Sequence, residues 1–213
     1  MKAYRIIVEP RLLKELTKEN PTITLTIEQM EKTHSTIGPL REPLSKYAVG
    51  DVVNVGGFEM VVLEQHGEET SLILKDLYVE ESGFGKNNNY DGSYVDEQCR
   101  KFALELAAIV GAENVVEHEV DLTSNDGLKC YGTVSRRASL LTADLYRKYV
   151  DVLDKFKLDK WWWLATPWST KRHDHEVCVL CVAPSGHFNI VSYFNDLGVR
   201  PFCILKSSIF VSC

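Results

Sequence analysis

The stretch Trp161-Trp-Trp-Leu-Ala-Thr-Pro167 predicts a β-strand that opens the last third of the chain. Neighbouring side chains of a β-strand point to opposite faces, so a strand here places Trp161 and Trp163 on one face and Trp162 on the other. Each such ring buries roughly 150–250 Å² in a typical protein. We therefore predict a buried strand whose tryptophans fill the core beneath the last hairpins.

Further short strands, separated by polar turns, are predicted before and after this stretch. Gly56-Gly57 indicates a hairpin turn within the apolar residues 49–63. Residues 71–77 are expected to form a third strand, and residues 81–92, rich in Gly, Asn and Ser, a loop. The strands of the last third are expected at about residues 161–166, 177–183, 188–194 and 199–205.

Two helices are predicted between these groups of strands. Ser93 and Asp96 occupy capping-box positions at the start of the first helix, and Gly111 is a suitable stop. Thr142 caps the second helix, which covers about residues 143–153. Helices that do not alternate strictly with strands indicate an α+β domain. Apolar residues recur at core-facing helical spacing at Val95, Cys99, Phe102, Ala103, Leu106 and Val110, and at Leu145, Tyr149, Val152 and Leu153.

Residues 1–45 are predicted to form a small N-terminal β/α appendage to a main domain of residues 46–213. Gly38 and Pro39 indicate a loop or linker near the end of this appendage. Its expected elements are a strand at residues 4–8, a helical stretch at residues 11–18 and a strand at residues 22–27.

The composition is that of a globular protein. The 213 residues carry 24 basic and 30 acidic side chains, a net charge of −6, and 45% of them are hydrophobic. This balance excludes a disordered chain and a general DNA-coating protein, so direct nucleic-acid binding is not expected. No apolar run reaches the roughly 18 residues of a membrane span, and the N-terminus lacks the pattern of a signal peptide. We expect a cytoplasmic protein, or one packed into a particle, whose six cysteines are free thiols.

Two motifs carry a resemblance to a known family. Trp162-Trp-Leu-Ala-Thr-Pro167 and Gly198-Val-Arg-Pro201 resemble the hallmark W-W-L-R-[ST]-P and G-V-R-P motifs of a bacterial and phage family of unknown function. Residues 49–59 look like the opening hairpin of that family, and residues 140–146 look like its middle helix. The resemblance covers about residues 47–211.

The resemblance implies a C-type-lectin-like fold with two helices and short antiparallel strands, similar to phage variable proteins and formylglycine-generating enzymes. In such folds a small scaffold displays a variable surface, which would here lie between Ser169 and Leu197. The chain departs from the family at Ala165, where the motif has arginine, so any ion pair made by that arginine is absent. Nothing in the chain matches the reactive cysteines of the formylglycine-generating enzymes, and their site is not carried over.

Neither a metal site nor a cofactor site is predicted. Residue types that bind zinc occur at His173, His175, Cys178 and Cys181. However, Val179-Leu180 favours a strand, which turns the two cysteines to opposite faces. Calcium-dependent sugar binding needs several oxygen ligands, and Phe194-Asn195-Asp196 has no partner element elsewhere.

No nucleophile motif or phosphate-binding motif is present, so we predict a protein that is not an enzyme. Arg200 is expected to tie strand ends together through backbone carbonyls. Aromatic, Arg, His and Asn side chains on turns resemble a binding surface in which flat rings give contact area at low entropic cost. The predicted binding residues are Trp168, Arg172, His173, His175, His187, Asn189, Tyr193, Phe194 and Asn195.

The leading hypothesis is a phage- or prophage-derived binding module that recognises a host or virion protein through these C-terminal hairpin loops. It would act in the host cytoplasm or in the virion. The alternative is an intracellular inhibitor of a host-defence nucleoprotein complex, because the acidic charge and the unmatched N-terminal appendage suit that role. A metal- or cysteine-dependent enzyme is the third hypothesis.

Overall fold

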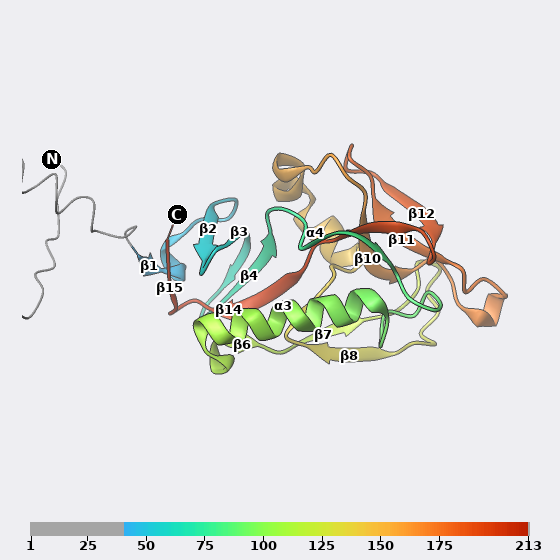
Figure 1. Ribbon diagram of the computed structural model, residues 1–213, viewed down its shortest axis with the longest axis horizontal. Helices are drawn as coiled ribbons and strands as arrows, with labels where there is room; N and C mark the ends of the chain where they lie inside the picture. The colour runs from blue at the N-terminus through green and yellow to red at the C-terminus, as the bar shows by residue number, and fades with distance from the viewer. Residues whose placement is uncertain (1–40, 213) are drawn as a thin grey trace, which may run out of the picture. The chain divides into compact units, whose positions relative to one another are not determined.

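Two larger β-sheets and two α-helices organise residues 41–212, the part of the chain that this computed structural model describes (Figure 1). The α+β class expected from the sequence is confirmed for these residues. The described residues, from Arg41 onwards, form one compact unit. The strands and the helical stretch expected within residues 1–40 lie outside the described residues.

The first sheet has six strands and contains the predicted opening hairpin. Gly56 and Gly57 join β2 to β3 with φ of 61° and 107°, a backbone region that favours glycine. The sheet order is β2 (Val52–Val55), β3 (Phe58–His66), β4 (Glu69–Leu74), β14 (Phe202–Lys206) and β6 (Val115–Val116), with β9 (Ala138–Ser139) also paired to β14.

The second sheet has five strands and contains the tryptophan stretch at its centre. Its strands are antiparallel except for β10 and β13, which run parallel where Trp162 pairs with Gly198. Its order is β12 (Phe188–Ser192), β11 (Cys178–Val182), β10 (Trp162–Pro167), β13 (Asp196–Val199) and β5 (Val79–Gly83).

The single strand predicted at residues 199–205 is wrong. Strand β13 ends at Val199 in the five-stranded sheet, and β14 begins at Phe202 in the six-stranded sheet. The two intervening residues, Arg200 and Pro201, carry the chain from one sheet to the other. Proline has no backbone N–H to donate within a ladder, which suits it to such a crossing.

Several short strands lie where none was predicted. Strand β5 begins before the loop predicted at residues 81–92 and occupies its first residues. Two-stranded ribbons form between β7 (His118–Asp121) and β8 (Thr133–Arg136), and between β1 (Glu42–Pro43) and β15 (Phe210–Val211). Because β1 pairs with β15 and Leu44 is fully buried, the domain begins before residue 46, the boundary expected from the sequence.

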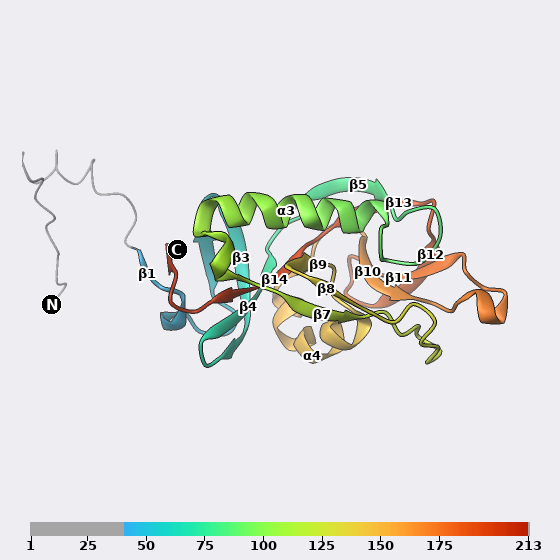
Figure 2. The same ribbon diagram turned by 90° about the horizontal axis from the view of Figure 1, so that it is seen from below.

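Both helices begin at the predicted caps and lie on opposite sides of the sheets (Figure 2). The Ser93 side chain accepts a hydrogen bond from the Asp96 N–H at the start of α3 (Tyr94–Val110), and Thr142 accepts one from Leu145 at the start of α4 (Ala143–Leu153). The buried face of α3 follows the prediction. On α4, Tyr146 is buried, whereas Leu145 and Val152 are only partly buried. Short 3-10 turns lie at η1 (Leu44–Lys46), η2 (Ala112–Asn114), η3 (Asp154–Phe156) and η4 (Lys171–His173).

Trp162 and Trp163 fill the core as predicted, whereas Trp161 lies just before β10 and is only half-buried. Every residue of β10 is buried, with Trp162 in an apolar cluster beneath α4 and Trp163 in a second cluster beneath α3. The Trp163 indole N–H donates to the Ser82 carbonyl over 2.8 Å, which satisfies its polar atom.

Arg200 ties strand ends together, as the sequence predicts. Its Nε donates to the Leu74 carbonyl and its Nη2 to the Lys75 carbonyl, each over 2.8 Å. The guanidinium also lies 5.3 Å from the centre of the Trp162 ring. Arg200 therefore links the end of β4 in one sheet to the central strand of the other.

No helix within residues 41–212 combines the length and the apolar character needed to cross a lipid bilayer.

His118 provides a test of the packing around β14. Burial lowers the pKa of His118 to about 4, against an opposing backbone hydrogen bond, and its Nε2 lies 2.9 Å from the Ser139 hydroxyl. Between pH 6.5 and about 4, His118 becomes protonated in the unfolded chain but stays neutral in the folded chain. The free energy of unfolding should therefore fall as the pH drops towards 4. We expect the free energy of unfolding of His118→Gln to fall by roughly 2 kcal/mol less than that of the parent chain over this pH range. Urea unfolding at several pH values measures the difference. The exposed His175→Gln is the control, and parallel pH profiles for H118Q and the parent chain would contradict the assignment.

Candidate functional site

Four loops meet at one end of the five-stranded sheet; they are residues 84–92, 122–132, 168–177 and 193–195, here called the loop end. In Figures 1 and 2 the segment with η4 projects past the ends of β11 and β12. Backbone hydrogen bonds of 2.9 Å connect the loops, from Phe84 N–H to the Tyr193 carbonyl, from Tyr193 N–H to the Val177 carbonyl and from Asn125 N–H to the Pro167 carbonyl.

Asn88 joins the two ends of the loop that carries η4, at Ser169 and Cys178, here called the neck of that loop. Its side chain is fully buried, and its Nδ2 donates to the Ser169 carbonyl over 2.9 Å and to the Cys178 carbonyl over 3.0 Å. Those carbonyls belong to the two ends of the loop. The Tyr131 hydroxyl donates to Asn88 Oδ1 over 2.7 Å, so a third loop braces the same amide. One asparagine therefore joins three of the four loops.

Asp126 holds the loop above this neck. Its carboxylate accepts hydrogen bonds from the Ser124 hydroxyl over 2.5 Å and from the Ser169 hydroxyl over 2.6 Å. The Nδ1 atom of His173 lies 2.9 Å from the same carboxylate. These contacts, that of Ser124 first, lower the pKa of Asp126 to about 2. The carboxylate therefore remains charged, and holds the two loops together, far below neutral pH.

The arrangement around Asp126 does not form a Ser–His–Asp catalytic set. In such a set the serine hydroxyl donates to the imidazole, whereas the Ser169 hydroxyl donates to the carboxylate. Among residues 41–212, no serine hydroxyl or cysteine thiol is hydrogen-bonded to the His173 ring. Cys130 is exposed, and its sulfur accepts a 3.4 Å hydrogen bond from the Thr170 hydroxyl.

The cysteines of β11 lie as the strand prediction requires. Cys178 is half-buried, whereas Cys181 is fully buried, and burial raises the pKa of the Cys181 thiol to about 12. A thiol held neutral in this way is a poor ligand for zinc. Within the described residues, no three His, Cys, Asp or Glu side chains are grouped closely enough to hold a metal ion.

The nine predicted binding residues do not form one patch. His187 lies in the turn before β12, while Tyr193 follows that strand, which separates them by roughly 17 Å of extended chain. His187 contacts Ser185 and the edge of Trp161 instead of the loop end. Seven of the nine are exposed, namely Arg172, His173, His175, His187, Asn189, Phe194 and Asn195, and two are half-buried, namely Trp168 and Tyr193.

Several of these side chains serve the fold itself. Trp168 packs against the apolar cluster beneath α4, so it is not a protruding anchor. The side-chain Oδ1 of Asn189 accepts from the Ile190 N–H over 2.8 Å, and Asn195 Nδ2 donates to the Ser192 carbonyl over 3.0 Å. Both asparagines therefore satisfy backbone groups of β12, the edge strand of the sheet.

Phe194 is the most exposed large apolar side chain of the loop end. It is 70% exposed and meets the Tyr193 ring edge to face at 5.5 Å. Tyr193 is held on both sides through its own N–H and carbonyl. Phe194 therefore stands on a support that is fixed by the backbone.

The residues that brace the loop end were missed from the sequence. Asn88 lies in the run Asn87-Asn88-Asn89, which has the composition of a solvated turn, and Asp126 lies in a similar Ser-Asn-Asp-Gly turn. Only the meeting of distant loops distinguishes the buried amide of Asn88 from the exposed Asn87 and the half-buried Asn89.

Comparisons with protein-family models, with curated proteins and with solved structures found no match for this chain.

Asn88 gives a direct test of the neck. Asn88→Ala leaves the buried Ser169 carbonyl without its donor and the Cys178 carbonyl with the Trp168 N–H alone, and we expect a loss of about 1–3 kcal/mol in the free energy of unfolding. Limited proteolysis should also cut residues 169–178 faster. Asn87→Ala is the matched control, because Asn87 is exposed and its Oδ1 bonds only locally, to the Asn89 N–H. Equal behaviour of N88A and N87A would show that the amide does not hold the loop.

Proposed function

We propose that this chain is a non-enzymatic binding module, derived from a phage or prophage, that recognises a protein partner through the loop end. We further propose that it belongs to the family with the W-W-L-R-[ST]-P and G-V-R-P motifs and has a C-type-lectin-like fold. The two helices, the short antiparallel strands and the loops gathered at one end of a sheet support this proposal.

The observation that carries the proposal is the exposure of Phe194 on a rigid support. Aromatic side chains are enriched among the residues that dominate the binding energy of protein interfaces. An exposed aromatic ring costs solubility unless a partner covers it, and here the ring projects from a turn fixed by two backbone hydrogen bonds.

The bracing of the neighbouring loop supports the same conclusion. Asn88 and Asp126 hold residues 168–177 through buried or charge-assisted hydrogen bonds before any partner arrives. A surface ordered in advance loses less conformational entropy on binding, which leaves more of the contact energy for affinity. Arg172 and His175 on this loop are exposed and available to contact a partner together with Phe194.

The test compares two phenylalanines of similar exposure. Phe194 is 70% exposed at the loop end, and Phe210 is 64% exposed on β15, at the other end of the described residues (Figure 1). We expect Phe194→Ala to weaken partner binding roughly tenfold or more, as loss of an interface hot spot does, with an unchanged thermal midpoint. Phe210→Ala should bind as the parent chain does. Capture from bacterial lysate, followed by affinity measurement with the captured protein, provides the comparison.

Four outcomes would count against the proposal. The first is that the parent chain captures no protein from the lysate beyond those that bind to the support without the chain. F194A could bind as tightly as the parent chain, or F210A could lose binding to the same extent. A large fall in the thermal midpoint of F194A would instead identify the ring as part of the core.

A further inference from the structure

Strand β12 is the outer strand of the five-stranded sheet and has a free edge. Among the described strands it pairs with β11 alone, and in Figure 1 it lies outside β11. Its sequence, Phe188-Asn-Ile-Val-Ser192, contains no charged residue and no proline. Charged side chains and prolines commonly keep the free edge of a sheet from pairing with another strand. Because β12 has neither, it needs another form of protection.

The register of β12 with β11 shows which backbone groups face the free edge. In an antiparallel pair, opposite residues alternately exchange hydrogen bonds and turn their N–H and carbonyl groups away from the partner strand. The Tyr193 N–H donates to the Val177 carbonyl over 2.9 Å, so odd-numbered residues bond towards β11. The even-numbered residues present their backbone groups to the free edge, and these are Phe188, Ile190 and Ser192.

Asn189 blocks the central one of these three positions. Its side-chain Oδ1 accepts a hydrogen bond from the Ile190 N–H over 2.8 Å. A backbone N–H has one hydrogen to donate, so this bond leaves none for the carbonyl of an incoming strand. Asn189 and Ile190 are both exposed, which places the bond on the surface of the molecule.

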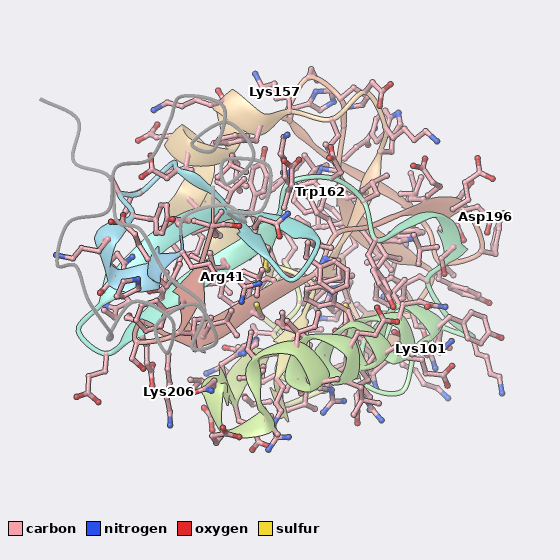
Figure 3. All side chains as sticks on the ribbon, turned by 60° about the vertical axis from the view of Figure 1, so that its left-hand side comes forward. Arg41, Lys101, Lys157, Trp162, Asp196 and Lys206 are labelled. Atoms are coloured by element: carbon pink, nitrogen blue, oxygen red, sulfur yellow. The ribbon has the colours of Figure 1, made fainter. Side chains whose placement is uncertain are left out.

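Asn195 blocks the position at the end of the strand. Its backbone N–H and its side-chain Nδ2 both donate to the Ser192 carbonyl, each over 3.0 Å. A carbonyl oxygen has two lone pairs, and these two donors occupy both of them. The turn then enters β13 at Asp196, which Figure 3 shows at the periphery of the molecule with Trp162 further in. The turn that covers the carbonyl therefore lies on the outside of the molecule.

We propose that Asn189 and Asn195 protect the free edge of β12 against strand addition, and that the strand they exclude is β12 of a second copy of this chain. An added antiparallel strand would exchange hydrogen bonds at all three outward-facing positions, and two of these exchanges are blocked. An uncharged strand has no charge with which to repel its own copy, and a symmetric antiparallel pair would place Ile190 opposite Ile190 of the copy. This inference concerns the sheet edge and does not depend on the proposed function.

The experiment measures self-association of the full chain by sedimentation velocity over a range of concentrations, with the parent chain as the baseline. Asn189→Ala frees the Ile190 N–H without adding apolar surface. A symmetric pair would then gain two hydrogen bonds, one from each copy, so we expect N189A to associate roughly tenfold more tightly than the parent chain. N189A/N195A should associate more tightly still.

Two controls make the proposal specific. Asn87→Ala removes an exposed asparagine away from the sheet and should associate as the parent chain does. Adding Ile190→Pro to N189A removes the freed N–H itself, which an edge strand tolerates where that group faces solvent, and should return association to the baseline. Hydrogen–deuterium exchange at low concentration reports the Ile190 N–H directly, and it should be faster in N189A than in N87A.

An unchanged exchange rate of the Ile190 N–H in N189A would overturn the proposal, because the side chain would then not block the edge. Faster exchange without tighter self-association would overturn the choice of a second copy as the excluded strand. Equal association of N189A and N189A/I190P would show that a different surface is responsible.

Discussion

The structure depends on one strand that has no face towards water. All six residues of β10 are buried, and its two faces belong to different apolar clusters, one beneath α4 and one beneath α3. Large aromatic rings contribute the most apolar area per residue, so Trp162 and Trp163 give β10 a large share in both clusters. Arg200 adds a connection from this strand to the end of β4 in the other sheet.

The parts of the fold that the sequence predicts are those with local causes. Ser93 and Thr142 cap their helices through their own hydroxyls, and Gly56-Gly57 forms a turn that few other residues could adopt. The parts that it does not predict have distant causes. Strands β6 and β9 have only two residues each and exist because β14 pairs with them, and the break at Arg200 reflects a change of sheet. No periodicity in such short segments could reveal these partners.

The candidate site divides in the same way. The sequence predicts a binding surface of aromatic, Arg, His and Asn side chains in residues 168–196, and Phe194 is the most exposed aromatic side chain of that stretch. The sequence could not show that His187 lies at the wrong end of β12, or that Trp168 belongs to the core. It also could not show that Asn88 and Asp126 brace the loop, because each contact joins residues more than forty positions apart.

The amide of Asn88 has a consequence for how this chain can change. The Asn88 side chain donates hydrogen bonds to both ends of the loop between Ser169 and Cys178. A longer or shorter loop between these two residues therefore need not displace the strands β10 and β11. Conformational changes within the loop would not be transmitted past Ser169 and Cys178. The chain therefore offers a graft position, at which foreign peptides could replace the residues between the two anchors while β10 and β11 keep their register.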